Sequence, residues 1–327
     1  MVADHDHVAP GQQRVGRRVP QPLDLLVGAR RADPIRRDVG ALYVYAGVEG
    51  ALFAETPTRA FFGQNSFDLF GSAHVTCDFN GDGVLDLAVG APFGQDADGA
   101  RDQGVIGVYL GYSGGRFVSS PDVNVVGQIL VDGEWVGHES MRLGESLAAG
   151  DYDGDGLCDL AAYASSPGPD QQDSGAVLLF RGRAPDDTGR GGPARQPSLF
   201  WALADGSDDN ARFGEDLAMG DVDGDGLADL LASRYLHDGA EGNDSGAIYL
   251  RRGRALSGPA TAITGVEAGA DWSREGGGSD RMGNAALLYD VDGDGRADVV
   301  SGDSRATPEE SELSRPGVVR VYRGAGG

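Results

Sequence analysis

An acidic nine-residue segment recurs four times in this chain at nearly constant spacing. It reads DFNGDGVLD from Asp78, DYDGDGLCD from Asp151, DVDGDGLAD from Asp221 and DVDGDGRAD from Asp290, with starts 73, 70 and 69 residues apart. Similarity at a fixed period is typical of repeat proteins, in which each unit buries its apolar surface against its neighbours. The chain is therefore predicted to fold as a series of similar units of about 70 residues.

A second series of segments, apolar and bounded by glycine, has the same period. The segments read GALYVYAG, GVIGVYLG, GAVLLFRG, GAIYLRRG and GVVRVYRG, starting at Gly40, Gly104, Gly175, Gly246 and Gly317. After a first interval of 64 residues, every interval is 71. Two independent series with one period indicate that each unit has the same internal order.

The segments of each unit have the character of short β-strands. One apolar stretch enters the acidic loop and another leaves it, followed by the glycine-bounded segment and a weaker fourth run, with no helical periodicity. The 54 glycines indicate many tight turns. Strands that are apolar on both sides indicate sheets stacked face to face. This pattern predicts an all-β fold, a β-propeller of four-stranded antiparallel blades.

The expected organisation is an atypical N-terminal segment, residues 1–20, followed by a propeller over residues 21–327. The repeats are expected at about 21–69, 70–142, 143–212, 213–281 and 282–327. About five blades are visible. The first lacks its acidic loop and the last stops after its third strand. Residues 8–19 could supply the missing strand and close the ring between the termini, but part of a larger, seven-bladed ring is slightly favoured because the first twenty residues are unlike the rest.

The acidic loops have the composition of calcium sites. Side chains at positions 1, 3, 5 and 9 and the carbonyl at position 7 supply hard oxygen ligands, and the glycines at 4 and 6 allow the backbone to turn. No His or Cys occupies a ligand position, which argues against zinc or copper, and the strand flanks argue against an EF-hand. About four structural Ca²⁺ sites are predicted. The predicted ligands are Asp78, Asn80, Asp82, Val84 and Asp86; Asp151, Asp153, Asp155, Leu157 and Asp159; Asp221, Asp223, Asp225, Leu227 and Asp229; and Asp290, Asp292, Asp294, Arg296 and Asp298.

The charge and hydropathy of the chain limit its partners and location. A net charge of −24 argues against nucleic acid and anionic membranes as partners. No apolar run is long enough to cross a membrane, and the N-terminus has no apolar core of a signal peptide. Calcium sites with affinities of roughly 10⁻⁴ to 10⁻³ M would be empty in the cytosol, so an extracellular or cell-surface location is expected.

Two further features are interpreted as structural. Cys77 and Cys158 belong to different repeats, so free thiols are favoured over a disulfide. The segment GYSGG at 111–115 has the spacing of a hydrolase nucleophile elbow but lies between strand-like segments, so it is interpreted as a hairpin turn. No catalytic constellation is visible, and the chain is not expected to be an enzyme.

These motifs resemble those of the FG-GAP repeat family, the units of integrin α-subunit propellers that also recur in bacterial surface proteins. The matching residues are Phe70–Gly71, Phe213–Gly214, the Gly-Ala-Pro element at 90–92 and the four acidic loops, within about residues 21–324. Leu143 and Met282 depart from the pattern by replacing the Phe. The resemblance implies a calcium-binding propeller, commonly seven-bladed, with the metal loops on one face, and this chain would be a bacterial-type member.

The predicted function is a protein- or glycan-binding adhesion scaffold, with the ligand held by the variable loops 92–103, 165–174, 234–245 and 302–316. One alternative is a polysaccharide-processing enzyme, which would need two carboxylates outside the metal loops, with Glu134, Glu139, Glu145 and Glu215 as candidates. A lectin is the other alternative, although no aromatic and polar pair recurs in every repeat. The sequence does not predict an oligomeric state.

Overall fold

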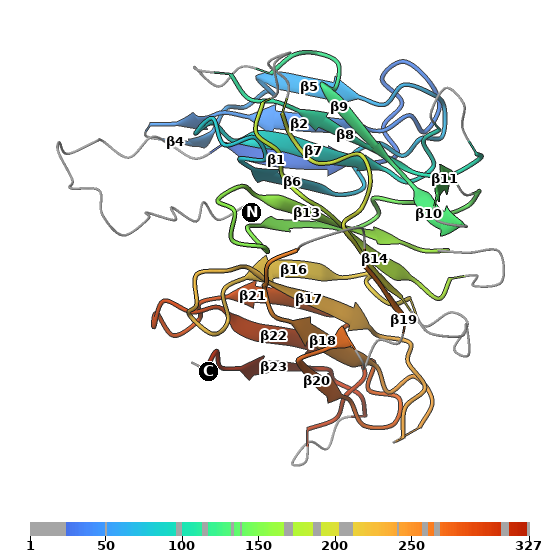
Figure 1. The fold of residues 1–327 in the computed structure, drawn as a ribbon, viewed down its shortest axis with the longest axis vertical. Helices are drawn as coiled ribbons and strands as arrows, with labels where there is room; N and C mark the ends of the chain where they lie inside the picture. Colours follow the sequence, from blue (N-terminus) through green and yellow to red (C-terminus); the bar gives the residue numbers. More distant parts are fainter. Residues whose placement is uncertain are drawn as a thin grey trace.

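The structure, a computed structural model, consists of β-sheets stacked in chain order (Figure 1). The described residues are 24–49, 51–95, 100–112, 117–131, 134–137, 139–166, 173–185, 191–202, 212–240, 242–256, 261–264, 269–308 and 314–325. The expected N-terminal segment, residues 1–20, lies outside them.

Five antiparallel sheets, which we number as blades 1 to 5, form the body of the molecule. Blade 1 contains β1 (Leu25–Ala29), β2 (Ala41–Tyr45) and β5 (Arg59–Phe62). Blade 2 contains β6 (His74–Cys77), β7 (Asp86–Ala91), β8 (Val105–Tyr109) and β9 (Val123–Val126). Blade 3 contains β12 (Leu147–Gly150), β13 (Asp159–Ala164), β14 (Ala176–Phe180) and β15 (Leu199–Ala202). Blade 4 contains β16 (Leu217–Gly220), β17 (Asp229–Arg234), β18 (Ala247–Arg251) and β20 (Trp272–Glu275), and blade 5 contains β21 (Ala285–Tyr289), β22 (Asp298–Asp303) and β23 (Val318–Tyr322).

The remaining strands decorate these blades. β3 (Gly47–Val48) pairs with β4 (Ala51–Phe53), and β10 (Gln128–Val131) pairs with β11 (Glu134–Gly137). β19 (Thr261–Thr264) pairs in parallel with β15 of blade 3. Every named element of the described chain is a strand, so the predicted all-β fold with about five blades is confirmed. The structure has no helix, among the residues it describes, that is long and apolar enough to span a bilayer.

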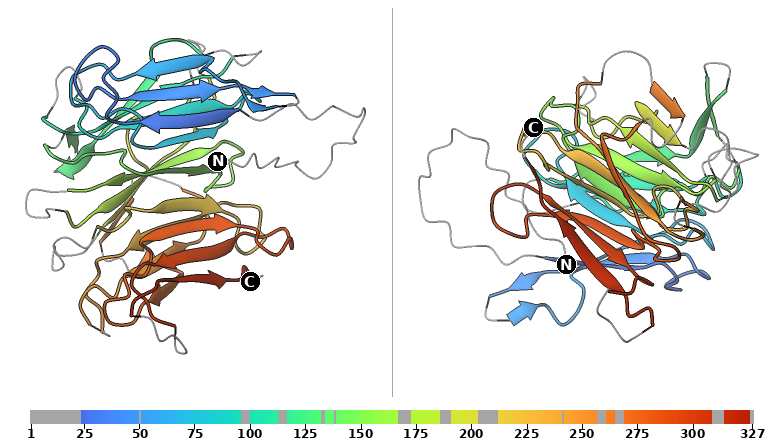
Figure 2. Two further views of the ribbon diagram at one scale, coloured as in Figure 1. Left: turned by 180° about the vertical axis from the view of Figure 1, so that it is seen from behind. Right: turned by 90° about the horizontal axis from the view of Figure 1, so that it is seen from below.

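The blades pack through their faces in chain order (Figure 2). β6, β12, β16 and β21 contact one another in this order. The second strands of blades 2, 3 and 4 are buried along their whole length, as expected for strands covered on both faces. Hydrophobic clusters therefore lie between blades, as where Trp201 of blade 3 meets Phe213 edge-to-face at 4.9 Å between ring centroids.

A short distance before the first strand of blades 2 to 5, the residue that precedes a glycine fills the same buried position at each junction. Phe70, Leu143, Phe213 and Met282 are all buried, so the two departures from Phe still supply an apolar side chain. The glycine that opens the third strand lies against this residue. A Cβ on Gly40, Gly104, Gly175 or Gly246 would lie 2.1–2.4 Å from the backbone of Phe70, Leu143, Phe213 or Met282, and all four glycines have a positive φ. The recurring glycines thus allow each blade to approach the next.

Among the residues that the structure describes, no blade packs against the outer face of blade 5. Val319 is 70% exposed, whereas Val177, its counterpart in blade 3, is 0% exposed. Leu287 and Val321 on the same face are also exposed. Gly317 has the same positive φ as the four junction glycines, but the nearest atom to its Cβ position is 3.5 Å away and belongs to its own blade.

The expectation of free thiols is wrong, because a disulfide joins Cys77 to Cys158. Cys77 precedes the acidic loop of blade 2, and Cys158 is the eighth residue of the acidic loop of blade 3. The register between blades brings these two positions together throughout the stack: a Cβ on Gly150 would lie 2.6 Å from Cβ of Ala228, the corresponding pair at the next junction. Distance along the sequence was therefore a poor guide to disulfide formation, because equivalent positions about one repeat apart are neighbours in space.

We predict that replacing both cysteines by alanine lowers stability by about 4 kcal/mol, because the disulfide closes an 81-residue loop in the unfolded chain. The thermal midpoint should fall by roughly 5–10 °C. Calorimetry under non-reducing conditions measures this, and the parent protein in reductant should melt like the variant. A parent protein insensitive to reductant would contradict the prediction.

Candidate functional site

The four acidic loops lie in a row at one end of the blades. Each connects the first and second strands of its blade, β6–β7, β12–β13, β16–β17 and β21–β22. The amide of position 8 donates to the carbonyl of position 1 in the preceding loop, from Cys158 to Asp78 at 3.1 Å, from Ala228 to Asp151 at 2.8 Å and from Ala297 to Asp221 at 2.7 Å. Each loop is therefore hydrogen-bonded to its neighbour across the blade junction.

Within each loop, the first carboxylate organises the turn. In blade 4, Asp221 accepts the amides of Gly224 at 2.6 Å and Gly226 at 2.9 Å, and both glycines have a positive φ. Asp225 accepts the amide of Leu227 at 2.8 Å. The same bonds to positions 4, 6 and 7 occur in the other three loops. The glycines allow a backbone that wraps around the acidic side chains.

The wrapped backbone brings several predicted ligands together. Oxygens of Asp151, Asp153 and Asp159 lie within 4.8 Å of one another, as do those of Asp221, Asp223 and Asp225 and those of Asp290, Asp292 and Asp294. In blade 2, Asn80 takes the place of the carboxylate at position 3, and its Oδ1 accepts a hydrogen bond from the amide of Asp82 at 3.0 Å.

The donor set fits a hard divalent cation. Carboxylates this close repel one another, and both oxygens of Asp153 are buried, with Arg181 as their ion-pair partner. Burial is the largest cause of the raised pKa of Asp153, followed by the charge of Asp155. A Ca²⁺ ion would satisfy these oxygens and offset the repulsion.

The ninth carboxylate of each loop has a second role that the sequence did not reveal. Asp86, Asp159, Asp229 and Asp298 are at most 1% exposed. Each accepts the amide of position 2 and that of the glycine after the third strand: Asp229 accepts from Val222 at 2.8 Å and from Gly253 at 2.9 Å. The other three have the same two bonds, with Gly111, Gly182 and Gly324 as the glycines. The ninth residue thus ties the loop to the third strand, and of these four only Asp159 falls in a carboxylate cluster among the described residues.

Burial of the ninth carboxylates shifts their pKa values. Loss of hydration raises the pKa of Asp86 and Asp229 to about 6 and that of Asp159 to about 7. The pKa of Asp298 is lowered instead, chiefly by the hydrogen bond from the Gly324 amide.

An arginine at the end of the third strand pairs with the carboxylate at position 3 of the loop. Arg181 contacts Asp153 through Nε and Asp155 at 3.0 Å, Arg252 lies 3.2 Å from Asp223, and Arg323 lies 3.5 Å from Asp292. Blade 2 has Leu110 in the place of the arginine and Asn80 in the place of the carboxylate. Each loop with an extra carboxylate therefore also has a guanidinium that balances it.

We predict that the metal-free protein loses stability as the pH rises from about 4 to about 7. Asp86, Asp159 and Asp229 have native pKa values above their ordinary 3.8, so between these pH values the native state binds protons that the unfolded state does not. Asp298 contributes with the opposite sign, but the raised groups outnumber it. Denaturant unfolding in chelator at pH 4.5 and 7.5 measures the trend, and calcium should flatten it. Greater stability at pH 7.5 in chelator would contradict this account.

We predict that Arg252→Met lowers the thermal midpoint of the metal-free protein by a few degrees and raises the calcium affinity of the blade 4 loop. The guanidinium next to Asp223 offsets repulsion when metal is absent and opposes a second cation when metal binds. Calorimetric calcium titration compares the variant with Arg305→Met, which removes an arginine that pairs with Asp244 instead. Equal calcium affinity in both variants would show that Arg252 does not affect the site.

Three of the four acidic loops lie within segments that match a known repeat family. The FG-GAP repeat pattern matches residues 70–109, 143–180 and 213–250, which run from the FG position to the third strand in blades 2, 3 and 4. Integrin alpha-5 of Xenopus laevis is 33% identical over 207 residues, covering 60% of this chain and 17% of that protein. Integrin alpha-4 of Xenopus laevis is 30% identical over 226 residues, covering 68% and 19%. This chain therefore spans less than a fifth of the length of these relatives.

Two enzymes are also similar to the chain. The phosphatidylinositol-glycan-specific phospholipase D of Rattus norvegicus is 33% identical over 165 residues, covering 48% of this chain and 18% of that protein. Among solved structures, a rhamnogalacturonan lyase of Bacillus licheniformis covers 86% of this chain and 53% of its own, with 15% identity and a TM-score of 0.38. The chain therefore contains FG-GAP repeats in three places and is similar there to integrin α subunits.

Proposed function

We propose that this chain is a calcium-stabilised, extracellular or cell-surface propeller that binds a protein or glycan ligand as an adhesion scaffold. The observation that carries the proposal is the row of four acidic loops, linked from blade to blade by backbone hydrogen bonds. A cation in each loop would stabilise both its own hairpin and the junction with the next blade.

The proposed calcium ligands are the side chains at positions 1, 3, 5 and 9 and the carbonyl at position 7 of each loop, as predicted from the sequence. Calcium supplies charge neutralisation in these loops. The protein itself supplies the wrapped backbone and the amides that orient the first carboxylate. The metal role is therefore structural.

The disulfide supports an extracellular location. Disulfides form and persist in oxidising environments and are rare in the cytosol. The Cys77–Cys158 bond lies at the acidic loops, where it fixes blade 2 to blade 3. Calcium sites of extracellular modules bind in the same environment, with affinities of roughly 10⁻⁴ to 10⁻³ M.

The proposed ligand surface lies at the opposite end of the blades. Because neighbouring strands are antiparallel, the β7–β8, β13–β14, β17–β18 and β22–β23 connections lie at the end away from the acidic loops. The described residues of the variable segments 92–103, 165–174, 234–245 and 302–316 belong to these connections or the strand ends beside them. Variable loops on a rigid scaffold are where binding residues usually occur.

The enzyme alternative has less support from the described side chains. Glu145 and Glu215 precede the neighbouring strands β12 and β16, at the same position of their repeats. Burial raises the pKa of Glu145, and the charge of Glu215 raises it further. Glu215, however, is paired with Arg212 at 3.3 Å, which is a structural ion pair rather than an acid and a nucleophile facing one substrate. Binding is therefore the function we propose.

We predict that Asp223→Ala removes one calcium ion from the four bound by the parent chain and reduces the rise in thermal midpoint that calcium produces. Asp223 belongs to the carboxylate cluster of blade 4, so its loss should empty one loop. Metal analysis after gel filtration and calorimetric titration measure the stoichiometry. The control is Glu55→Ala, which removes an exposed charge away from the loops. Equal calcium binding in the two variants would refute the assignment.

A further inference from the structure

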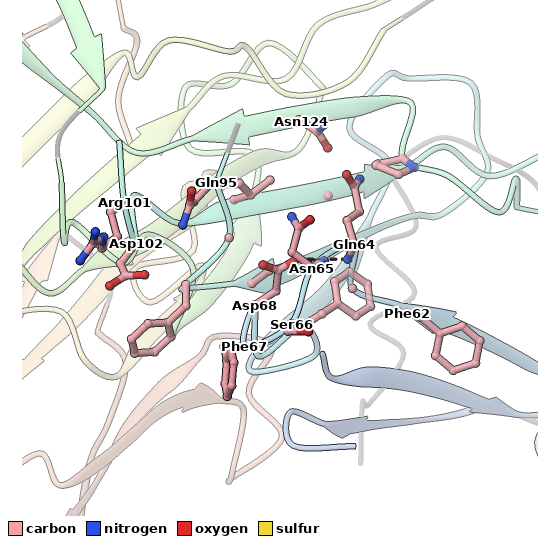
Figure 3. Close-up of a pocket in the computed structure, with 18 of the residues that line it drawn as sticks. Phe62, Gln64, Asn65, Ser66, Phe67, Asp68, Gln95, Arg101, Asp102 and Asn124 are labelled. Atoms are coloured by element: carbon pink, nitrogen blue, oxygen red, sulfur yellow. Dashed lines mark hydrogen bonds between the residues drawn. The ribbon is translucent and has the colours of Figure 1, made fainter. Parts of the chain in front are cut away.

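A cleft of about 720 Å³ lies between blades 1 and 2 (Figure 3). Blade 1 contributes Phe62 and residues 63–68 and 70 of the connection to β6. Blade 2 contributes residues 93–95, 101 and 102 of the β7–β8 connection together with Gly107, Tyr109, Pro121 and Asn124. This volume is within the range of about 300–1,000 Å³ typical of small-molecule sites. The acidic loops do not line it.

The cleft exists because blade 2 lacks a side chain that its neighbours have. The fourth residue of the recurring third-strand segment is Gly107 in blade 2, Leu178 in blade 3 and Tyr249 in blade 4. Leu178 and Tyr249 are buried against the preceding blade. Gly107 leaves the corresponding space open, and a glycine in the middle of a strand often marks the close approach of a ligand. Its φ is not positive, so the backbone itself does not require glycine here.

A polar group faces this space from the neighbouring strand. Asn124 lies directly opposite Gly107 in the β8–β9 pairing, and it lines the cleft. Its Oδ1 is buried and has no hydrogen-bond partner. A buried acceptor without a partner costs about 1–3 kcal/mol, so a ligand that donates a hydrogen bond here would recover that cost.

Amide side chains recur in the polar part of the lining. Gln64, Asn65 and Gln95 join Asn124 around the cleft, and Figure 3 shows Gln64 and Asn65 pointing toward the space that Asn124 faces. The backbone of Gln64 and Asn65 is fixed by Asp68, whose Oδ2 accepts their amides at 3.1 Å and 2.7 Å. Each primary amide offers both donors and an acceptor, as a row of hydroxyl groups requires.

The apolar and charged lining narrows the ligand class. Phe62 and Phe67 expose ring surface at the cleft, and Tyr109 forms part of its wall. Aromatic faces suit the C–H faces of sugar rings, while the amides suit the hydroxyl groups. The charged residues of the lining, Asp68, Arg101 and Asp102, include both signs, so the lining does not select a strongly charged ligand.

We propose that the cleft between blades 1 and 2 is a binding site for a neutral saccharide, with Asn124 and Gln64 hydrogen-bonding its hydroxyl groups and Gly107 providing the space for a ring. The proposal rests on the binding role proposed above and gives that role a ligand class. It does not depend on the acidic loops, because none of their residues lines the cleft.

The test is ligand-detected NMR with a panel of neutral oligosaccharides, cellobiose, lactose, maltotriose and mannobiose, added to the calcium-loaded chain. Gly107→Leu places in blade 2 the side chain that blade 3 has and should reduce binding at least tenfold while the thermal midpoint is kept. Gly107→Ala is the matched control, because its methyl group would meet Pro121 and Tyr109 at an ordinary 3.4 Å and leave the cleft open. Asn124→Ala, which leaves the backbone unchanged, should also reduce binding at least tenfold.

Binding of a panel member by the parent and Gly107→Ala, lost in Gly107→Leu and Asn124→Ala, supports the proposal. No binding by the folded parent, equal binding in all variants, or capture of a peptide or a charged oligogalacturonide instead would overturn it. The calcium-binding role is scored separately with Asp223→Ala, which should lose calcium and keep the saccharide. Failure of one proposal is thus distinguishable from failure of the other.

Discussion

Repulsion between carboxylates at one end of the blades is the interaction on which the fold depends most. Three of the four acidic loops gather carboxylate oxygens within 4.8 Å of one another among the described residues, and the four loops are neighbours in one row. The chain offsets part of this repulsion itself, through Arg181, Arg252 and Arg323 and through backbone amides that turn toward the first and ninth carboxylates. A cation in each loop would offset the remainder.

The same loops connect the blades to one another. The amide of position 8 in one loop donates to the carbonyl of position 1 in the loop before it. Between blades 2 and 3, a disulfide from Cys77 to Cys158 joins the same two loops. The apolar faces of the blades require a neighbour on each side, so loop order and core packing depend on each other. Stabilising one loop therefore stabilises a junction as well as a hairpin.

Much of the architecture could be predicted from the sequence because it is encoded in repeated local patterns. The acidic loops, the glycine-bounded strands and the stacking of two-sided sheets follow from period and composition alone. The turns of the acidic loops could also be located, since the glycines at positions 4 and 6 mark where the backbone turns. Leu143 and Met282 looked like departures from the family pattern, but both fill the buried position that Phe70 and Phe213 fill.

Contacts between repeats were harder to predict, because they depend on the register of one blade against the next. The disulfide was missed for this reason. The pairing of the third-strand arginine with the carboxylate at position 3 lies within one blade and was missed because the two residues are far apart in the repeat. The hydrogen bonds of the ninth carboxylates were missed because their donors are backbone amides, which have no sequence signal of their own apart from the recurring Gly111, Gly182, Gly253 and Gly324. Gly107 breaks the repeat pattern at one position. The open space beside it could not be predicted from the sequence, because it depends on Leu178 and Tyr249 filling the equivalent space in blades 3 and 4.

The most direct test of the central claim is a thermal melt of the whole chain in excess chelator, in millimolar calcium and in millimolar magnesium. The account predicts a single cooperative transition that rises by many degrees in calcium and little in magnesium, because the loops offer flexible hard-oxygen ligands rather than a strict octahedron. An unchanged midpoint in calcium, for a folded sample shown by metal analysis to start without bound metal, would contradict it.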